Sequence, residues 1–162
     1  MAQHLSTLTV VHVLISLVGI ASGLVVVCGL LTSRRVEGWT QLFLATTIAT
    51  SVTGFFFPFH GFTPAIGVGI LSLVVLTVAI FARYSFRLEN SWRWIYAAAA
   101  LTALYFNVFV LIVQSFQKIA ALKALAPTQT EPPFLIAQAA ALLIFLALGA
   151  GAVRRFRPPG HT

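Results

Sequence analysis

Charged residues divide the chain into five long apolar runs. The runs cover about residues 8–32, 40–57, 64–82, 94–116 and 134–153. Each is close to the roughly 20 residues that an α-helix needs to cross about 30 Å of hydrocarbon. The apolar–polar alternation of transmembrane β-strands does not occur. The pattern therefore predicts an all-α, polytopic transmembrane helical bundle with five spans, folded as a single domain over residues 1–162.

A turn, not a charge cluster, separates the second and third runs. No Asp, Glu, Lys or Arg occurs from Gly38 to Ala82. One straight helix of that length would measure about 67 Å, roughly twice the hydrocarbon thickness. The PFHGFTP segment, residues 58–64, holds two prolines and a glycine, which favour a turn. The two runs are predicted to form a transmembrane hairpin, and a re-entrant hairpin is the alternative.

Arginine placement predicts how the bundle is oriented. When successive loops are assigned to alternate sides, one side receives only Lys118 and Lys123. Cytoplasmic loops of membrane proteins are enriched in Lys and Arg, so the other side is predicted to be cytoplasmic, with the N-terminus outside and the C-terminus inside. That side also holds Trp39, Trp92 and Trp94 at its boundary, and it receives all the arginines: Arg34, Arg35, Arg83, Arg87, Arg93, Arg154, Arg155 and Arg157.

The connection between the fourth and fifth runs is predicted to carry a short amphipathic helix. Apolar residues recur at helical spacing within residues 117–126, and the two lysines fall on other faces. Pro127 would end this helix, and an irregular TQTEPP segment would follow. We expect the segment to lie on the outer surface of the membrane.

Composition excludes a water-soluble domain. Only 8% of the residues are charged and the mean hydropathy is +0.98, whereas soluble domains carry about 25% charged residues. The net charge of +7 does not indicate nucleic-acid binding, because the basic residues form short clusters between apolar runs.

The first run follows a stretch without Lys or Arg and is predicted to be a retained span. The lone Cys28 lies in that run and is expected to act as a small membrane-buried hydrophobe.

Strongly polar side chains inside a membrane are costly and therefore indicate function or specific packing. Those of this chain gather in the outer half of the predicted bundle, and Asn107 and Gln114 are seven residues apart, on nearly one helical face. They predict an outward-facing polar pocket. The alternative is that they form interhelical hydrogen bonds that fix packing. The candidate pocket residues are His12, His60, Asn107, Gln114 and Gln138.

Small and hydroxyl-bearing residues form stripes at helical spacing on the first two runs. Gly19 and Gly23 make a small-xxx-small pair, which allows helices to approach closely. We expect these stripes to face neighbouring helices and not lipid. The candidate packing residues are Ser16, Gly19, Gly23, Thr46, Thr50 and Gly54.

Cofactor and enzyme chemistry has little support in the sequence. His12 and His60 could be the axial ligands of one haem, but membrane cytochromes usually hold both ligands on helices. A metal site would lack a third evident protein ligand. No span contains an acidic residue for proton or cation coupling. Glycine-rich phosphate loops, cysteine pairs and HExxH are absent, so no enzyme class is indicated.

The segments GFFFPFHGFTPA and ALAPTQTEPPF, together with TSRRVEGWTQLFLATT and RRFRP, resemble small multi-pass membrane proteins of proteobacteria. The resemblance implies a bacterial inner-membrane location and transfers no activity. Our first hypothesis is an accessory or structural membrane component that acts through helix contacts with a second copy or another membrane protein. The alternatives are a small-molecule binding or transport protein that uses the outer pocket, or a one-haem redox protein.

Overall fold

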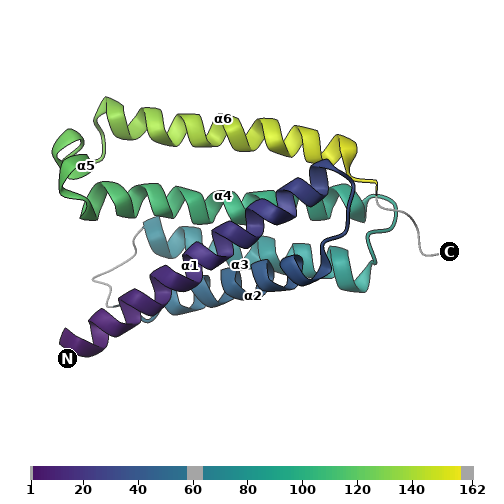
Figure 1. Ribbon diagram of the computed structural model, residues 1–162, viewed down its shortest axis with the longest axis horizontal. Helices are drawn as coiled ribbons and strands as arrows, with labels where there is room; N and C mark the ends of the chain where they lie inside the picture. The colour runs from purple at the N-terminus through teal and green to yellow at the C-terminus, as the bar shows by residue number, and fades with distance from the viewer. Residues whose placement is uncertain (1, 58–63, 158–162) are drawn as a thin grey trace.

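The computed structural model describes residues 2–57 and 64–157, and every regular element in these ranges is helical (Figure 1). This confirms the all-α prediction. A single π-helical turn, η1 (Phe81–Ser85), continues the third long helix. The α-helices are α1 (Ala2–Leu31), α2 (Glu37–Gly54), α3 (Pro64–Ile80), α4 (Trp92–Lys118), α5 (Ala120–Leu125) and α6 (Pro132–Arg155).

Four helical stretches in the described ranges are long and apolar enough to cross a membrane. They are Thr7–Leu31, Ala65–Ser85, Trp92–Lys118 and Pro132–Arg155. The prediction of five such spans is not supported in that form, because α2 is not among them. The reason lies in its composition, EGWTQLFLATTIATSVTG, in which threonines, a serine, a glutamine and a glutamate dilute the apolar residues.

Figure 1 shows the long helices lying side by side, with the start of α1 and the end of α6 at opposite ends of the bundle. α4 lies centrally, packed against α1, α3 and α6, while α2 packs between α1 and α3. The α1–α2 connection and the turn after η1 lie at the end where α6 finishes, so the arginines gather there. The α4–α5–α6 connection, which carries both lysines, lies at the other end.

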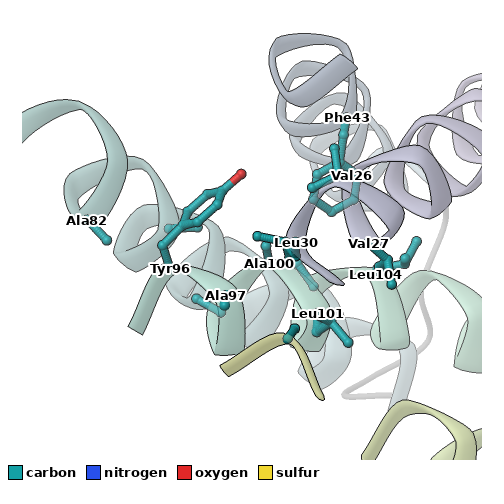
Figure 2. Packing of buried hydrophobic residues seen from close by; sticks show 14 of the residues in the cluster. Val26, Val27, Leu30, Phe43, Ala82, Tyr96, Ala97, Ala100, Leu101 and Leu104 are labelled. Carbon is teal, nitrogen blue, oxygen red and sulfur yellow. The ribbon is translucent and has the colours of Figure 1, made fainter. Parts of the chain in front are cut away.

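The apolar core occupies the arginine end of the bundle. Figure 2 shows Val26, Val27 and Leu30 of α1 packed close to Phe43 of α2 and to the alanine-rich first half of α4. Small alanines let the helices approach closely. In contrast, no residue from Thr7 to Val18 of α1 is buried. The bundle is therefore tightly packed at one end and looser at the other, where α1 diverges from α6 (Figure 1).

The predicted amphipathic segment 117–126 is shorter than expected. α4 continues to Lys118, the backbone becomes extended at Ile119, and α5 covers only Ala120–Leu125, with no buried residue. The segment that follows, residues 126–131, is irregular and held by hydrogen bonds, but the last two residues of the predicted irregular TQTEPP already belong to α6, which begins at Pro132. Gln129 donates from Nε2 to the carbonyl oxygen of Val113 on α4 at 2.9 Å.

Candidate functional site

A partly open cavity of about 480 Å³ lies among α1, α2, α3 and α4, in the half of the bundle away from the apolar core. Its lining is mainly apolar, with the aromatic rings of Phe106 on α4 and of Phe55 and Phe57, which follow α2. Three of the five predicted pocket residues, His12, Asn107 and Gln114, line it. Its other polar lining residues are Thr9, Ser16, Thr50, Ser51, Ser72, Ser115 and Lys118.

His12 is half-buried and is fixed by contacts with α2 and the residues that follow it. Its Nδ1 lies 2.8 Å from Thr53 Oγ1, and its ring meets Phe57 edge-on with centroids 5.2 Å apart. The Thr53 hydroxyl directs its single hydrogen to the carbonyl oxygen of Ala49 at 2.7 Å. This favours Nδ1 of His12 as the donor to Thr53, which makes Nε2 the acceptor nitrogen of the ring.

Asn107 is 9% exposed and donates from Nδ2 to Thr47 Oγ1 at 3.2 Å. The contact joins α4 to α2 on the floor of the cavity. Gly19 of α1 lies directly against it, because a Cβ atom at Gly19 would be 3.5 Å from Asn107 Nδ2. Asn107 thus serves packing and lines the cavity, and the two hypotheses for this residue are not exclusive.

Thr50 supplies a hydrogen-bonding group that the protein leaves unused. It is 9% exposed, it lines the cavity, and its Oγ1 has no hydrogen-bond partner among the described residues. Ser51 and Ser72, which also line the cavity, bond to each other at 3.2 Å and join α2 to α3. A buried hydroxyl without a partner is uncommon in folded proteins, and a ligand or water is its usual explanation.

The structure separates Gln138 from the other candidates. Gln138 lies on α6, donates from Nε2 to the carbonyl oxygen of Phe109 at 3.3 Å, and does not line the cavity. α6 packs on the far side of α4, so Gln138 belongs to the α4–α6 contact. The fifth candidate, His60, lies outside the described residues.

The predicted packing residues lie on the inner faces of α1 and α2. Gly19 and Gly23 are buried, and Thr46 lies half-buried beside Gly19. Ser16 and Gly54 also line the cavity, where a Cβ atom at Gly54 would meet only His12 Cε1, at 3.7 Å. Gly54 is therefore close to open space and not to a tight contact.

Within residues 2–57 and 64–157, the structure adds no further candidate ligand for a metal ion or a haem. Among the described residues, no group of three or more His, Cys, Asp and Glu side chains lies close enough together to hold a metal ion. The haem hypothesis requires His60 and stays a prediction.

Sequence reasoning missed an ion pair at the other end of the bundle. Arg83 in η1 is 7% exposed and donates from Nη2 to Glu37 Oε2 at the start of α2. The available signal was that Glu37 is one of only three acidic residues and Arg83 ends a long uncharged run.

No protein-family profile, curated protein or solved structure matches the chain. The resemblance to proteobacterial membrane proteins therefore remains a prediction, and function is argued from the geometry alone.

Proposed function

We propose that this is a bacterial inner-membrane protein that binds a small amphipathic molecule in the cavity among α1–α4. The observation that carries the proposal is the convergence of His12, Asn107 and Gln114, from two helices, on one cavity. The same cavity is lined by Thr50, whose hydroxyl has no partner within residues 2–57 and 64–157. A mainly apolar cavity of about 480 Å³ with a few convergent polar groups is typical of small-molecule sites.

The lining defines the chemistry of the ligand. The apolar walls favour a hydrocarbon or ring body, and the acceptor nitrogen of His12 together with Thr50 and Asn107 favours a polar head that donates and accepts hydrogen bonds. Lys118 is the lining residue that carries a full charge. We therefore infer a neutral or anionic amphipathic molecule.

The proposed topology has five crossings, with the N-terminus outside and the cavity in the outer leaflet. α2 lies beside α3 along the bundle and is 18 residues long, about 27 Å. Two of its hydroxyl groups bond within the helix, because Thr46 donates to the Leu42 carbonyl oxygen at 2.6 Å and Thr53 to the Ala49 carbonyl oxygen at 2.7 Å. These bonds lower the cost of the two polar residues in lipid. The gathering of arginines at one end supports a cytoplasmic assignment for that end.

Cysteine labelling in intact cells tests this topology. In a background with Cys28→Ser, Thr128→Cys should react with a membrane-impermeant maleimide, whereas Glu89→Cys should react only after the membrane is permeabilised. Both parent residues are exposed in connections at opposite ends of the bundle. Equal labelling of the two sites in intact cells would refute the orientation.

The binding proposal is tested by filling the cavity from Gly54. Gly54→Leu adds a side chain toward His12 and the cavity, while Gly149→Leu is a matched control, because nothing lies within 4 Å of a Cβ atom at Gly149. A diazirine-bearing long-chain fatty acid serves as the probe. Photolabelling of the α4 segment 106–115 should fall about tenfold or more in Gly54→Leu and stay unchanged in Gly149→Leu. Equal labelling of both variants would contradict the proposal.

A function based on helix contacts alone has weaker support. Large apolar side chains of α6, such as Ile136, Leu143 and Leu146, are more than half exposed. Contact with lipid accounts for this face without a protein partner. A second copy of the chain or another membrane protein at this face remains the alternative, and cross-linking from α6 would detect it.

A further inference from the structure

A second cavity, of about 400 Å³, lies at the arginine end of the bundle. It is formed by the α1–α2 connection, the start of α2, η1 and the turn that follows η1. Its lining residues are Arg35, Glu37, Arg83, Tyr84, Arg87 and Leu88. Three arginines and one glutamate thus line the same cavity.

Arg83 forms the fixed wall of this cavity. The π-helical turn η1 holds its side chain inside the bundle, where it pairs with Glu37 and where its guanidinium carbon lies 5.3 Å from the centroid of the Tyr96 ring. π-Helical turns occur frequently at functional sites. The Nε atom of Arg83 is buried and has no hydrogen-bond partner among the described residues. Arg83 therefore retains donor capacity after its pairing with Glu37.

Ordered connections present the other two arginines. Arg87 has a positive φ of 49°, and the next amide, Leu88 N–H, closes the turn by donating to the Ala82 carbonyl oxygen at 3.0 Å. Phe86 stacks on Trp92 with ring centroids 3.8 Å apart, which ties the turn to α4. On the other wall, Arg35 follows a connection closed by the Arg34 N–H bond to the Gly29 carbonyl oxygen at 2.8 Å.

We propose that this cavity binds a phosphate group, carried by an anionic phospholipid headgroup or present as free phosphate. Guanidinium groups present paired donors that match the oxygens of phosphate. Several arginines around one cavity therefore favour a phosphate ligand over a ligand with a single carboxylate group. Tyr84 also lines the cavity, and its hydroxyl can donate a hydrogen bond. Exposed Trp39 and Trp94, in the first turns of α2 and α4, lie at the same end of the bundle. Such aromatic residues mark the depth of lipid headgroups.

The test compares two charge-matched double variants of the full chain, purified in a mild detergent. Arg35→Gln/Arg87→Gln removes two arginines from the cavity, while Arg34→Gln/Arg154→Gln removes two exposed arginines that do not line it. Bound lipid is counted by native mass spectrometry after titration with phosphatidylglycerol, with phosphatidylcholine as the neutral comparison. Inorganic phosphate is titrated separately, and binding is followed as a rise in the unfolding temperature.

We expect phosphatidylglycerol to bind wild type and the Arg34/Arg154 variant equally, and the Arg35/Arg87 variant about tenfold or more weakly per arginine removed. Inorganic phosphate is the ligand if it raises the unfolding temperature saturably in wild type and in the Arg34/Arg154 variant but not in the Arg35/Arg87 variant. If inorganic phosphate does not raise the unfolding temperature, the ligand is the lipid. Equal binding by the two double variants, or no preference for phosphatidylglycerol over phosphatidylcholine together with no response to phosphate, would overturn the proposal. If the Arg35/Arg87 variant does not fold, Arg87→Gln alone, at an exposed position, serves in its place. The result does not depend on the cavity among α1–α4.

Discussion

Asn107 of α4 donates a hydrogen bond to the hydroxyl of Thr47 on α2, and both side chains are buried. Gly19 of α1 lies against this contact. Three helices therefore meet at one polar contact. The Asn107 Nδ2 to Thr47 Oγ1 distance is 3.2 Å, and a Cβ atom at Gly19 would lie 3.4 Å from the same Oγ1. α1 therefore lies within van der Waals distance of this pair at Gly19.

A double-mutant cycle should show that Asn107 and Thr47 are coupled. Asn107→Ala and Thr47→Val each remove the shared hydrogen bond, and such bonds in membrane bundles are worth about 0.6 kcal/mol on average and up to about 1.7 kcal/mol. We therefore expect the double variant to be more stable than the sum of the single effects predicts, by about 0.6–1.7 kcal/mol. The measurement is reversible unfolding in mixed micelles. Strictly additive effects would show that the contact contributes no stability.

Gly23 should tolerate substitution much less well than Gly149. A Cβ atom at Gly23 would lie 2.6 Å from Leu104 Cδ1 and 2.9 Å from Phe43 Cδ2, and both of these side chains are buried. Gly23→Ala is therefore expected to destabilise the bundle by about 1–3 kcal/mol through overpacking. Gly149→Ala, which meets nothing within 4 Å, is the control and should be neutral. Thermal unfolding of the two variants in one detergent decides the matter, and equal unfolding temperatures would be inconsistent with the packing described.

The helix positions were predictable because hydrophobicity and charge act locally. The predicted fourth run, 94–116, became α4 at Trp92–Lys118, since the cluster around Arg93 and the polar residues after Phe116 interrupt the apolar sequence. The span predicted at α2 is not supported by its hydropathy, because a count of charges treats threonine as neutral. The hydroxyls of Thr46 and Thr53 donate to carbonyl oxygens of their own helix, which sequence periodicity does not register.

The candidate site was only partly predictable, because depth along a helix can be estimated from sequence but helix neighbours cannot. His12, Asn107 and Gln114 were assigned to one half of the bundle by their distance from the span ends, and the structure places them around one cavity. Gln138 has a similar depth, yet α6 lies on the other side of α4. The Arg83–Glu37 pair joins residues 46 positions apart and depends on the same helix order.

Loss of the Glu37 carboxylate should leave a buried charge without a partner. Arg83 is 7% exposed, whereas the Glu37 side chain is more than half exposed. Glu37→Gln should therefore lower the free energy of unfolding by about 1–3 kcal/mol, which lies between the effects of breaking an exposed and a buried ion pair. Glu89→Gln, at an exposed position in the following turn, is the control and should have little effect. Glu37→Gln/Arg83→Met should be more stable than Glu37→Gln alone in the same unfolding assay, because it removes the orphaned charge. A double variant that is less stable would contradict this account.

The connection before α6 should respond to acid through Glu131. Partial desolvation raises the pKa of its carboxyl group, but hydrogen bonds from the Thr128 hydroxyl and amide and from the Thr130 amide outweigh this, so the pKa lies below its ordinary value of 4.5. Because the pKa of Glu131 is lower in the folded protein than in the unfolded chain, these hydrogen bonds stabilise the folded state fully at pH values above the ordinary pKa. The stabilisation is lost as the pH falls through the lowered pKa of the folded protein. The amide chemical shifts of Thr128 and Thr130, followed by NMR in detergent, should titrate together with a midpoint below 4.5. Glu131→Gln should abolish this titration and leave the amides of the cavity residues unchanged. A midpoint at or above the ordinary value would mean that the carboxylate does not hold the two threonine amides.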